Sequence, residues 1–502
     1  AAKIKMFAAH SEILHDEELV EEIENTIMEQ SKKTDYAVME VYEEFINIIK
    51  KAKDELIAAR AADFCDVRDR LLQVLQGDKR KDLSHMECPV IIVAHDLLPS
   101  DTATLDRVNV LGIITELGSA TSHTAIIANS YRIPAISGVD NCTNILQDAK
   151  CVGVDALLGE VYIEPDTITL NILEEKKSDY QRKLLDEEKY LDKPLQTLDG
   201  IQLQIGLNIG GVEDLTVYGY SDFIGLFRTE FLYMANDHMP TEEEQFTAYS
   251  TVLKRAAGKP VTLRTLDIGG DKSLPYLPLP KEENPFLGNR ALRLCLLKPD
   301  IFRTQLRAAL RASAFGELWL MLPMVGSIDD IRRARAVYDD VKVQLEKEGV
   351  PIGKNVKFGI MIEIPAIAVI ADLVAPLVDF ASVGTNDLCQ YLCAVDRMEA
   401  EVIDYYQPLS PAMIRILSGI SEAFHAHGKP VSVCGELAGS KHGALLLAGL
   451  GYEKLSMSES NMTGVKWAMA KVTMIQLQNA VKEAGNMLTQ SDVISLFNAI
   501  LG

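Results

Sequence analysis

The chain has 502 residues, enough for about two to four domains, and hydrophobic residues make up 48% of it, which supports large cores. Its formal net charge of −22 argues against binding to nucleic acid or to an anionic membrane surface. No apolar run approaches the roughly 20 residues of a membrane-spanning helix, and no signal peptide is visible. The eight cysteines form no Cys-x-x-Cys motif, so we expect a cytoplasmic protein in a reducing compartment.

The first part of the chain, residues 1–77, has helical periodicity and many charges, with apolar residues such as Leu19, Ile23 and Ile27 at i, i+4 spacing. This pattern predicts a helical bundle. The acidic run over residues 16–22 is interpreted as a solvated helix face or, alternatively, as a docking surface for a basic protein. The chain does not begin with methionine, so we expect a further segment before it.

Short apolar runs between turns predict a small α/β domain over residues 78–165. Within it, Val110–Ile114 has the composition of a buried strand, Gly118 turns the chain, and a helix is expected to begin near His123. The free N–H groups and positive dipole at a helix start favour an anion and disfavour imidazolium, so a neutral, nucleophilic imidazole is expected. The alternative is an ordinary surface histidine near a helix cap.

The next segment, residues 166–195, is highly charged and contains no glycine. It predicts an exposed linker helix that is closed by Pro194.

Residues 196–502 alternate between strand-like and helical runs. Eight such units in about 300 residues favour a (β/α)8 barrel over a doubly wound sheet. The strand-like runs are Ile201–Ile209, Asp222–Phe227, Val261–Leu266, Trp319–Val325, Val356–Ile364, Phe380–Val383, Val431–Cys434 and Lys454–Met457.

The predicted strands end on polar residues, which is unusual for buried segments because an unpaired buried charge is costly. A barrel enzyme places its active site at the carboxyl ends of its strands. The polar strand ends are Arg228 to Glu230, Arg264 to Asp267, Glu363, Asn386 with Asp387, and Cys434 to Glu436. We therefore predict an active site at this end, with structural ion pairs as the alternative for any single residue.

The residue types at these ends suit a small, strongly anionic substrate. Glu363 and Asp387 are hard carboxylates that suit Mg²⁺. Cys434 is a candidate proton donor, with a buried core cysteine as the alternative. Planar guanidinium groups for phosphate and carboxylate come from Arg228, Arg264, Arg290 and Arg397.

Long ordered motifs over nearly the whole chain resemble the Enzyme I family of the bacterial sugar phosphotransferase system, within the phosphoenolpyruvate-utilising enzymes. These motifs are TSHT, GLFRTEFLYM, PTEEEQF, RTLDIGGDK, PKEENPFLGNRALR, QLRAALRASAFG, SVGTNDLCQY, AVDR and CGELAG. The resemblance implies a multidomain α and α/β protein. Its parts would be a helical domain that binds the carrier protein HPr, a swivelling phosphohistidine α/β domain, a linker helix, and a TIM barrel. The barrel would bind phosphoenolpyruvate and Mg²⁺ and form a homodimer.

The same resemblance implies individual roles. His123 would take the phosphoryl group from phosphoenolpyruvate and pass it to HPr, while Cys434 would protonate the enolate of pyruvate. Glu363 and Asp387 would hold Mg²⁺, and Thr102 would lie beside the imidazole. The substrate would be bound through its phosphate by Arg228, Arg264 and Arg397 with Asn386, and at its carboxylate end by Arg290.

The chain departs from the family pattern mainly around His123. Gly-Ser-Ala replaces the usual Gly-Gly-Arg or Gly-Gly-Lys, so Ala120 stands in place of a cation, and Cys65 and Asn129 stand where arginine is expected. Asn289 replaces an expected tryptophan. We therefore expect autophosphorylation to be retained and either the phosphorylated His123 or the handover to HPr to be altered. Rival interpretations are a fragment similar to pyruvate phosphate dikinase or phosphoenolpyruvate synthase, and a non-catalytic regulator that senses phosphoenolpyruvate.

Overall fold

The computed structural model describes residues 10–501 except residues 12, 51–60, 77–82, 98–100, 103–104, 119–122, 216–217, 270–273, 275 and 281. The chain divides into two compact units, residues 1–181 and residues 182–502, and each is described by itself. The finer division at residues 77, 165 and 195 stays a prediction. No helix in the described ranges is long and apolar enough to cross a membrane.

The first unit begins with helices α2 (Glu17–Gln30), α3 (Thr34–Lys50) and α5 (Ala61–Gln76). Asp16 caps α2, because its Oδ1 accepts the main-chain N–H of Leu19 at 3.0 Å. The inner faces of the three helices form one apolar cluster that includes Leu19, Val41 and Tyr42. The predicted helical architecture is confirmed for the described residues.

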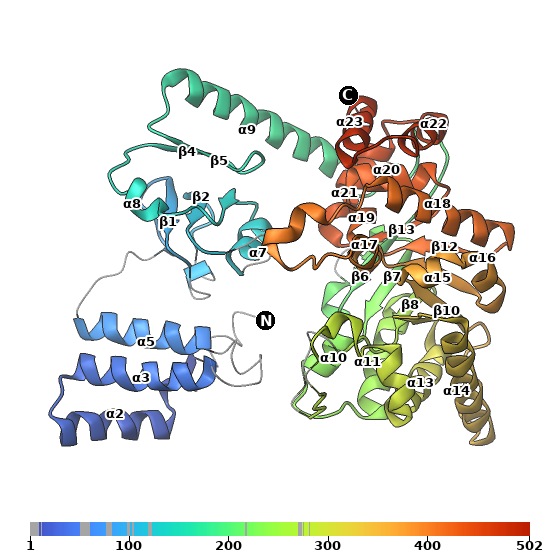
Figure 1. Ribbon diagram of the computed structural model, residues 1–502, viewed down its shortest axis with the longest axis horizontal. Coiled ribbons are helices and arrows are strands. Elements are labelled where there is room, and N and C mark those ends of the chain that lie inside the picture. Colours follow the sequence, from blue (N-terminus) through green and yellow to red (C-terminus); the bar gives the residue numbers. More distant parts are fainter. Residues whose placement is uncertain are drawn as a thin grey trace. The chain divides into compact units, whose positions relative to one another are not determined.

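A small α/β region follows in the same unit (Figure 1). Its parallel sheet has the order β1 (Val90–Ala94), β2 (Val110–Thr115) and β3 (Ala135–Ile136), with helices α7 (His123–Ser130) and α8 (Cys142–Ile145). A separate antiparallel pair consists of β4 (Val152–Asp155) and β5 (Glu160–Ile163). The strand predicted over Val110–Ile114 and the helix predicted to begin near His123 are therefore both confirmed.

The charged linker is the helix α9 (Thr167–Glu188), whose side chains are mostly exposed. It ends at Glu188, earlier than the predicted stop at Pro194. After Glu188 the chain continues in turns, in which the N–H of Tyr190 donates to the carbonyl of Glu187 at 2.9 Å. In the last turn of α9, Asp186 accepts the indole N–H of Trp467 at 2.7 Å, and Glu187 pairs with Lys441. These contacts fix the last turn of α9 against the barrel.

The second unit contains a closed barrel of eight parallel strands, which confirms the predicted (β/α)8 fold. The strands are β6 (Gln204–Ile209), β7 (Phe223–Arg228), β8 (Val261–Arg264), β9 (Leu318–Leu322), β10 (Lys357–Ile362), β11 (Phe380–Val383), β12 (Val431–Val433) and β13 (Lys454–Met457). They follow one another around the barrel in chain order, and β13 pairs with β6 to close it. Each strand lies within or next to one of the eight predicted runs.

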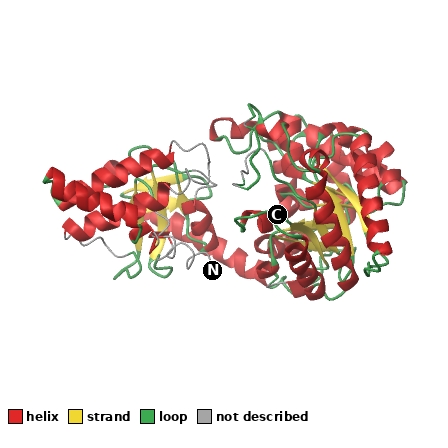
Figure 2. Ribbon diagram, turned by 90° about the horizontal axis from the view of Figure 1, so that it is seen from below, coloured by secondary structure: helices red, strands yellow, loops and turns green. Residues whose placement is uncertain are grey.

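Helices surround these strands, as the secondary-structure colours show (Figure 2). The large core lies between the strands and the helices. The helices are α10 (Glu230–Met234), α11 (Glu242–Arg255), α12 (Leu292–Leu297), α13 (Pro299–Ala312), α14 (Ile328–Lys347), α15 (Pro365–Val369), α16 (Ala371–Val374), α17 (Thr385–Cys393), α18 (Pro411–Ala426), α19 (Glu436–Gly439), α20 (Lys441–Gly449), α21 (Glu459–Met469), α22 (Met474–Ala484) and α23 (Gln490–Leu501).

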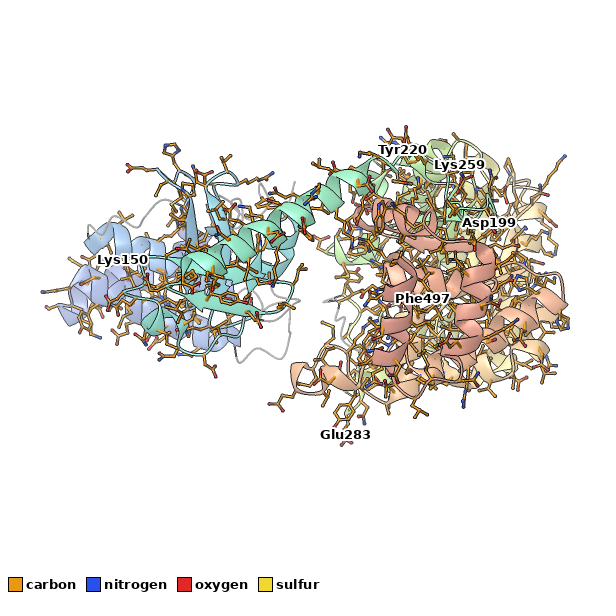
Figure 3. The ribbon with its side chains drawn as sticks, turned by 90° about the horizontal axis from the view of Figure 1, so that it is seen from above. Lys150, Asp199, Tyr220, Lys259, Glu283 and Phe497 are labelled. Atoms are coloured by element: carbon orange, nitrogen blue, oxygen red, sulfur yellow. The ribbon has the colours of Figure 1, made fainter. Side chains whose placement is uncertain are left out.

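Hydrogen bonds between side chains and the main chain tie together segments at the amino end of the barrel. Lys466 is buried and its Nζ donates to the carbonyl of Tyr220 at 3.1 Å, and Lys259 Nζ donates to the carbonyl of Ser221 at 2.6 Å. Asp199 accepts a main-chain N–H at the start of α22 at 3.1 Å. Tyr220, Lys259 and Asp199 are labelled in Figure 3. In a TIM barrel this end serves stability, which leaves the other end for function.

Trp319 on β9 belongs to a separate buried cluster formed by strand residues. The Nζ atoms of Lys357 and Lys454 lie 4.2 and 4.7 Å from its ring centre, a cation–π arrangement. Phe380 packs against the same ring at a centroid distance of 4.8 Å. The cluster also contains Cys434. It therefore links the packed strands to the predicted site at their carboxyl ends.

Candidate active site

Charged side chains gather at the carboxyl ends of the barrel strands. Arg228 and Arg264 are the last residues of β7 and β8, Glu363 follows β10, and Asp387 lies in the first turn of α17, after β11. Because the strands are parallel, these ends meet at one end of the barrel. We call the following residues the strand-end cluster: Arg228, Glu230, Arg264, Asp267, Arg290, Glu363, Asp387 and Arg397.

Asp267 is the shared counter-ion of two buried arginines. Both of its carboxylate oxygens accept from Arg290, at 2.8 and 3.0 Å, and Arg264 Nη1 lies 2.8 Å from its Oδ2. Arg264 also pairs with Glu230, and Arg290 Nη2 donates to Asp387 at 3.2 Å. Breaking such a buried pair from one side is costly, so these guanidinium groups are held in fixed orientations.

Two further arginines make no close ion pair with a described carboxylate. Arg397 Nη2 lies 3.7 Å from Asp387 Oδ1, beyond hydrogen-bonding distance. Arg228 is half-buried and makes no hydrogen bond or ion pair with any described residue. Planar guanidinium groups in this state suit the oxygen atoms of a phosphate or carboxylate ligand.

The two predicted metal ligands lie in the same cluster. Glu363 is 1% exposed, and its Oε1 accepts the main-chain N–H of Met324 at 2.6 Å. Met324 has a φ of +54°, an uncommon conformation for a residue other than glycine. Burial, and then the nearby Asp387 and Asp267 carboxylates, raise the pKa of Glu363 well above its ordinary value.

A divalent cation beside Glu363 and Asp387 would lower that pKa again, so the charge balance fits a metal ion. Among the described residues, no group of three or more His, Cys, Asp or Glu side chains has metal-binding geometry. A set of two carboxylates suits Mg²⁺, which usually completes its shell with substrate oxygens and water.

Several buried polar atoms at this end have no hydrogen-bond partner among the described residues. They are Arg264 Nε, Arg290 Nη1, Arg397 Nη1, Asp387 Oδ1, Thr265 Oγ1, Thr385 Oγ1, Ser382 Oγ and Asn289 Oδ1. All belong to β8, β11 or the segments that follow these strands. A buried polar atom without a partner is costly, so their concentration here indicates a site built to bind a polar ligand.

Cys434 directly follows β12 and is 3% exposed. Burial raises the pKa of its thiol to about 11, so the thiol stays protonated at neutral pH, which is the state that a proton donor needs. Its Sγ lies 3.7 Å from the carbonyl of Val383, the last residue of β11. The charges of Arg264, Glu363 and Arg228 also act on the pKa of this thiol.

The start of α17 lies close to the segment that follows Cys434, and Gly435 and Asn386 make this approach possible. A Cβ on Gly435 would lie 2.0 Å from Thr385 Oγ1, so only glycine fits between these segments. Asn386 Oδ1 accepts the main-chain N–H of Glu436 at 2.9 Å. The structure thus brings together all the barrel residues that the sequence singled out; their roles in binding and chemistry stay predictions.

The predicted nucleophile lies in the first unit. His123 begins α7, as expected, but its side chain, that of Asn129, and the whole of residues 119–122 with Ala120 lie outside the described part of the structure. Thr102 is fully buried. Its proximity to His123 stays a prediction, as does the effect of Cys65, which is half-buried on α5.

The sequence showed Glu230 and Asp267 as charged strand ends but assigned them no role. The signal that could have found them is charge balance, because four arginines near one another require carboxylate counter-ions. Gln305, which supports this region from α13, is the first residue of the quoted motif QLRAALRASAFG, but the sequence assigned it no role. Lys272, another charge after β8, lies outside the described residues.

Comparisons with known proteins agree along the whole chain. Family models described as the PEP-binding, mobile and N-terminal domains of PEP-utilising enzymes match residues 185–474, 86–159 and 1–60, respectively. The phosphoenolpyruvate-protein phosphotransferases of Priestia megaterium and Staphylococcus carnosus are each 42% identical. They align with 98% and 99% of this chain, and 86% and 87% of their own lengths are covered. A solution structure of an Enzyme I protein is 39% identical over 36% of this chain and 73% of its own, with a TM-score of 0.33.

Proposed function

Because the chain belongs to the family of phosphoenolpyruvate-protein phosphotransferases, we propose that it transfers the phosphoryl group of phosphoenolpyruvate to His123 and then to a histidine of the carrier protein HPr. The observation that carries this proposal is the strand-end cluster. Its arginines, carboxylates and buried thiol have the chemistry that this substrate requires.

Phosphoenolpyruvate carries a phosphate and a carboxylate on one small carbon frame. Arg228 and Arg397 are free to receive the phosphate together with Arg264 and Asn386, while Arg290 serves the carboxylate end. The buried N–H groups without partners on Arg264, Arg290 and Arg397 support this assignment. Fixed guanidinium groups that stabilise developing charge are the main contribution of a protein to phosphoryl transfer.

Glu363 and Asp387 are the residues that would hold Mg²⁺. The ion would neutralise charge on the transferring phosphoryl group. The raised pKa of Glu363 and the unbonded Oδ1 of Asp387 support a cation between them.

In the proposed reaction, His123 accepts the phosphoryl group and Cys434 supplies the proton that converts the enolate to pyruvate. A ring nitrogen of His123 bonds to phosphorus as the bond between phosphorus and the enol oxygen breaks. The leaving enolate takes the proton of the Cys434 thiol at its terminal carbon and becomes pyruvate, and the thiolate regains a proton from solvent. The pKa of Cys434, about 11, supports a thiol that begins each cycle protonated.

His123 and the strand-end cluster belong to different units, so the α/β domain must serve two partners in turn. We infer that it swivels on the α9 linker between the barrel and HPr, and that HPr docks on the helices near the acidic run of α2. We also propose that two copies of the chain form a homodimer through their barrels. The acidity of residues 16–22 supports a basic face on the carrier.

Incubation of the full chain with ³²P-labelled phosphoenolpyruvate and Mg²⁺ tests this function. We expect acid-labile, base-stable label on the wild type and none on His123→Ala, since phosphohistidine has this lability. His85→Ala, an exposed histidine of the same region, is the matched control and should label normally. Absence of label on the wild type would instead identify a non-catalytic regulator, and label on His123→Ala would place the nucleophile elsewhere.

A further inference from the structure

A buried amide on α13 connects the two strand ends that carry half of the strand-end cluster. Gln305 is 0% exposed. Its Oε1 accepts the main-chain N–H of Leu266 at 2.8 Å, and its Nε2 donates to Thr229 Oγ1 and to Tyr249 Oη, at 3.1 Å each. None of these bonds reaches a side chain of the cluster, so any effect of Gln305 on the site must act through its partners.

Two of those partners belong to the segments that carry the site. Leu266 directly precedes Asp267, the shared counter-ion of two arginines. Thr229 lies between two members of the cluster, and its Oγ1 donates to the main-chain carbonyl of Arg264 at 2.8 Å. Gln305 therefore holds the main chain at the ends of both β7 and β8, in addition to the hydrogen bond from the Thr265 N–H to the carbonyl of Met321 on β9 at 2.9 Å.

We propose that Gln305 is a positioning residue for phosphoryl transfer, because it fixes the main chain that carries Arg264 and Asp267. This inference rests on the function proposed for the barrel site. A shift of a catalytic group by about 1 Å can lower a rate on the order of a hundredfold. An amide with both N–H groups and one acceptor position engaged restrains its partners more strongly than an apolar side chain of the same volume.

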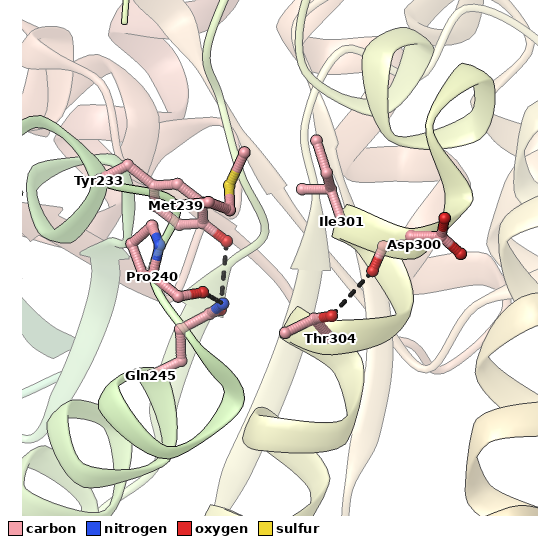
Figure 4. Close-up of a pocket in the computed structure, with 7 residues that line it drawn as sticks. All are labelled: Tyr233, Met239, Pro240, Gln245, Asp300, Ile301 and Thr304. Atoms are coloured by element: carbon pink, nitrogen blue, oxygen red, sulfur yellow. Dashed lines mark hydrogen bonds between the residues drawn. The ribbon is translucent and has the colours of Figure 1, made fainter. Parts of the chain in front are cut away.

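A second glutamine of the same region provides a matched control. Gln245 on α11 is 1% exposed and also makes three hydrogen bonds. Its Oε1 accepts from Tyr233 Oη at 3.1 Å and from Tyr249 Oη at 3.0 Å, and its Nε2 donates to the carbonyl of Pro240 at 2.9 Å. It lines a cavity of about 160 Å³, as the close-up shows (Figure 4). No bond of Gln245 reaches a strand end of the site directly; it is connected to Gln305 only through Tyr249 Oη, which both amides contact.

The experiment compares Gln305→Met with Gln245→Met in the full chain, since each change removes three hydrogen bonds and roughly preserves volume. Isotope exchange between phosphoenolpyruvate and pyruvate gives kcat and KM, and thermal unfolding gives the structural cost. We expect similar melting temperatures but a kcat roughly tenfold or more lower in Gln305→Met, with KM nearly unchanged. Equal kcat values at a temperature where both variants are folded would overturn the inference.

The Thr229 hydroxyl offers a second route that does not alter Gln305. Thr229→Val is isosteric and removes the bonds to Gln305 and to the Arg264 carbonyl, so its kcat should fall as well, whereas Thr229→Ser should restore most of it. Wild-type kcat in the valine variant would count against the positioning role. A wild-type chain that exchanges no label would overturn the proposed function, and this inference with it; an active wild type with indistinguishable glutamine variants overturns the inference alone.

Discussion

At the scale of single residues, the carboxyl end of the barrel contains two kinds of arginine. Arg264 and Arg290 share Asp267, with contacts of 2.8 to 3.0 Å, and are buried with it. Arg228 is half-buried and has no counter-ion among the residues that the structure describes. The first kind is held in a fixed orientation by its counter-ions, and the second kind has no such ion pair to lose. The two kinds therefore differ in what their removal changes.

Replacing Asp267 by asparagine should lower the free energy of unfolding of the barrel by about 3–5 kcal/mol, because two buried guanidinium groups lose their shared charge. Urea denaturation measures this loss. Arg228→Gln is the comparison: we expect a change of stability below about 1 kcal/mol, since no ion pair is broken, together with a raised KM for phosphoenolpyruvate. A large loss of stability in Arg228→Gln, or none in Asp267→Asn, would contradict the distinction.

At the scale of elements, one aspartate organises the connection that enters β2. Asp106 accepts the main-chain N–H groups of Met86 and Val108 and the side-chain amide of Asn109, each at 3.0 Å. The hydrogen bond from Met86, followed by those from Asn109 and Val108, lowers the pKa of Asp106 to about 2. The charged form of this carboxylate thus holds the turn that leads into the strand before His123.

Because the pKa of Asp106 is lower in the folded state, its contribution to stability is fully present above the ordinary aspartate pKa of about 4 and is lost as the pH falls toward 2. Asp106→Asn should therefore melt at a lower temperature than the wild type at pH 7, and the difference should shrink between pH 4 and pH 2. Calorimetry of the full chain measures this effect. Asp140→Asn, which changes an exposed carboxylate without a hydrogen bond to the described residues, should show no such trend.

The elements themselves could largely be predicted, whereas contacts between distant residues could not. Eight apolar runs with polar ends were sufficient to predict the barrel, since buried parallel strands have this composition. Sequence spacing does not reveal that Arg290 returns to Asp267, 23 residues earlier, or that Gln305 reaches back 39 residues to Leu266. Such pairings depend on how α12 and α13 pack on the barrel.

At the scale of the whole molecule, the proposed function requires His123 to serve a substrate in the barrel and a carrier protein in turn. From the resemblance described above, cations are expected near this histidine at the positions of Ala120 and Asn129. Such cations would stabilise a phosphorylated imidazole or contact the carrier protein, because guanidinium groups bind phosphate.

Introducing Ala120→Arg together with Asn129→Arg should increase the rate of phosphoryl transfer from the chain to HPr, while labelling of His123 by phosphoenolpyruvate stays similar. Rapid-quench measurement of label passing to HPr tests this expectation. A pair of lysines at exposed positions of α9, such as Ile168→Lys with Ile172→Lys, controls for net charge. An unchanged rate of transfer would show that these cations are dispensable.

The placement of Trp319 between two lysines on the barrel, and of Trp467 against the end of α9, has a spectroscopic consequence. These are the two tryptophans of the chain, and both lie in residues 182–502. Intrinsic indole emission therefore reports on residues 182–502, while residues 1–181 contribute only tyrosine signal. Far-ultraviolet ellipticity recorded alongside tryptophan emission would therefore show, without any added dye, whether residues 1–181 unfold separately.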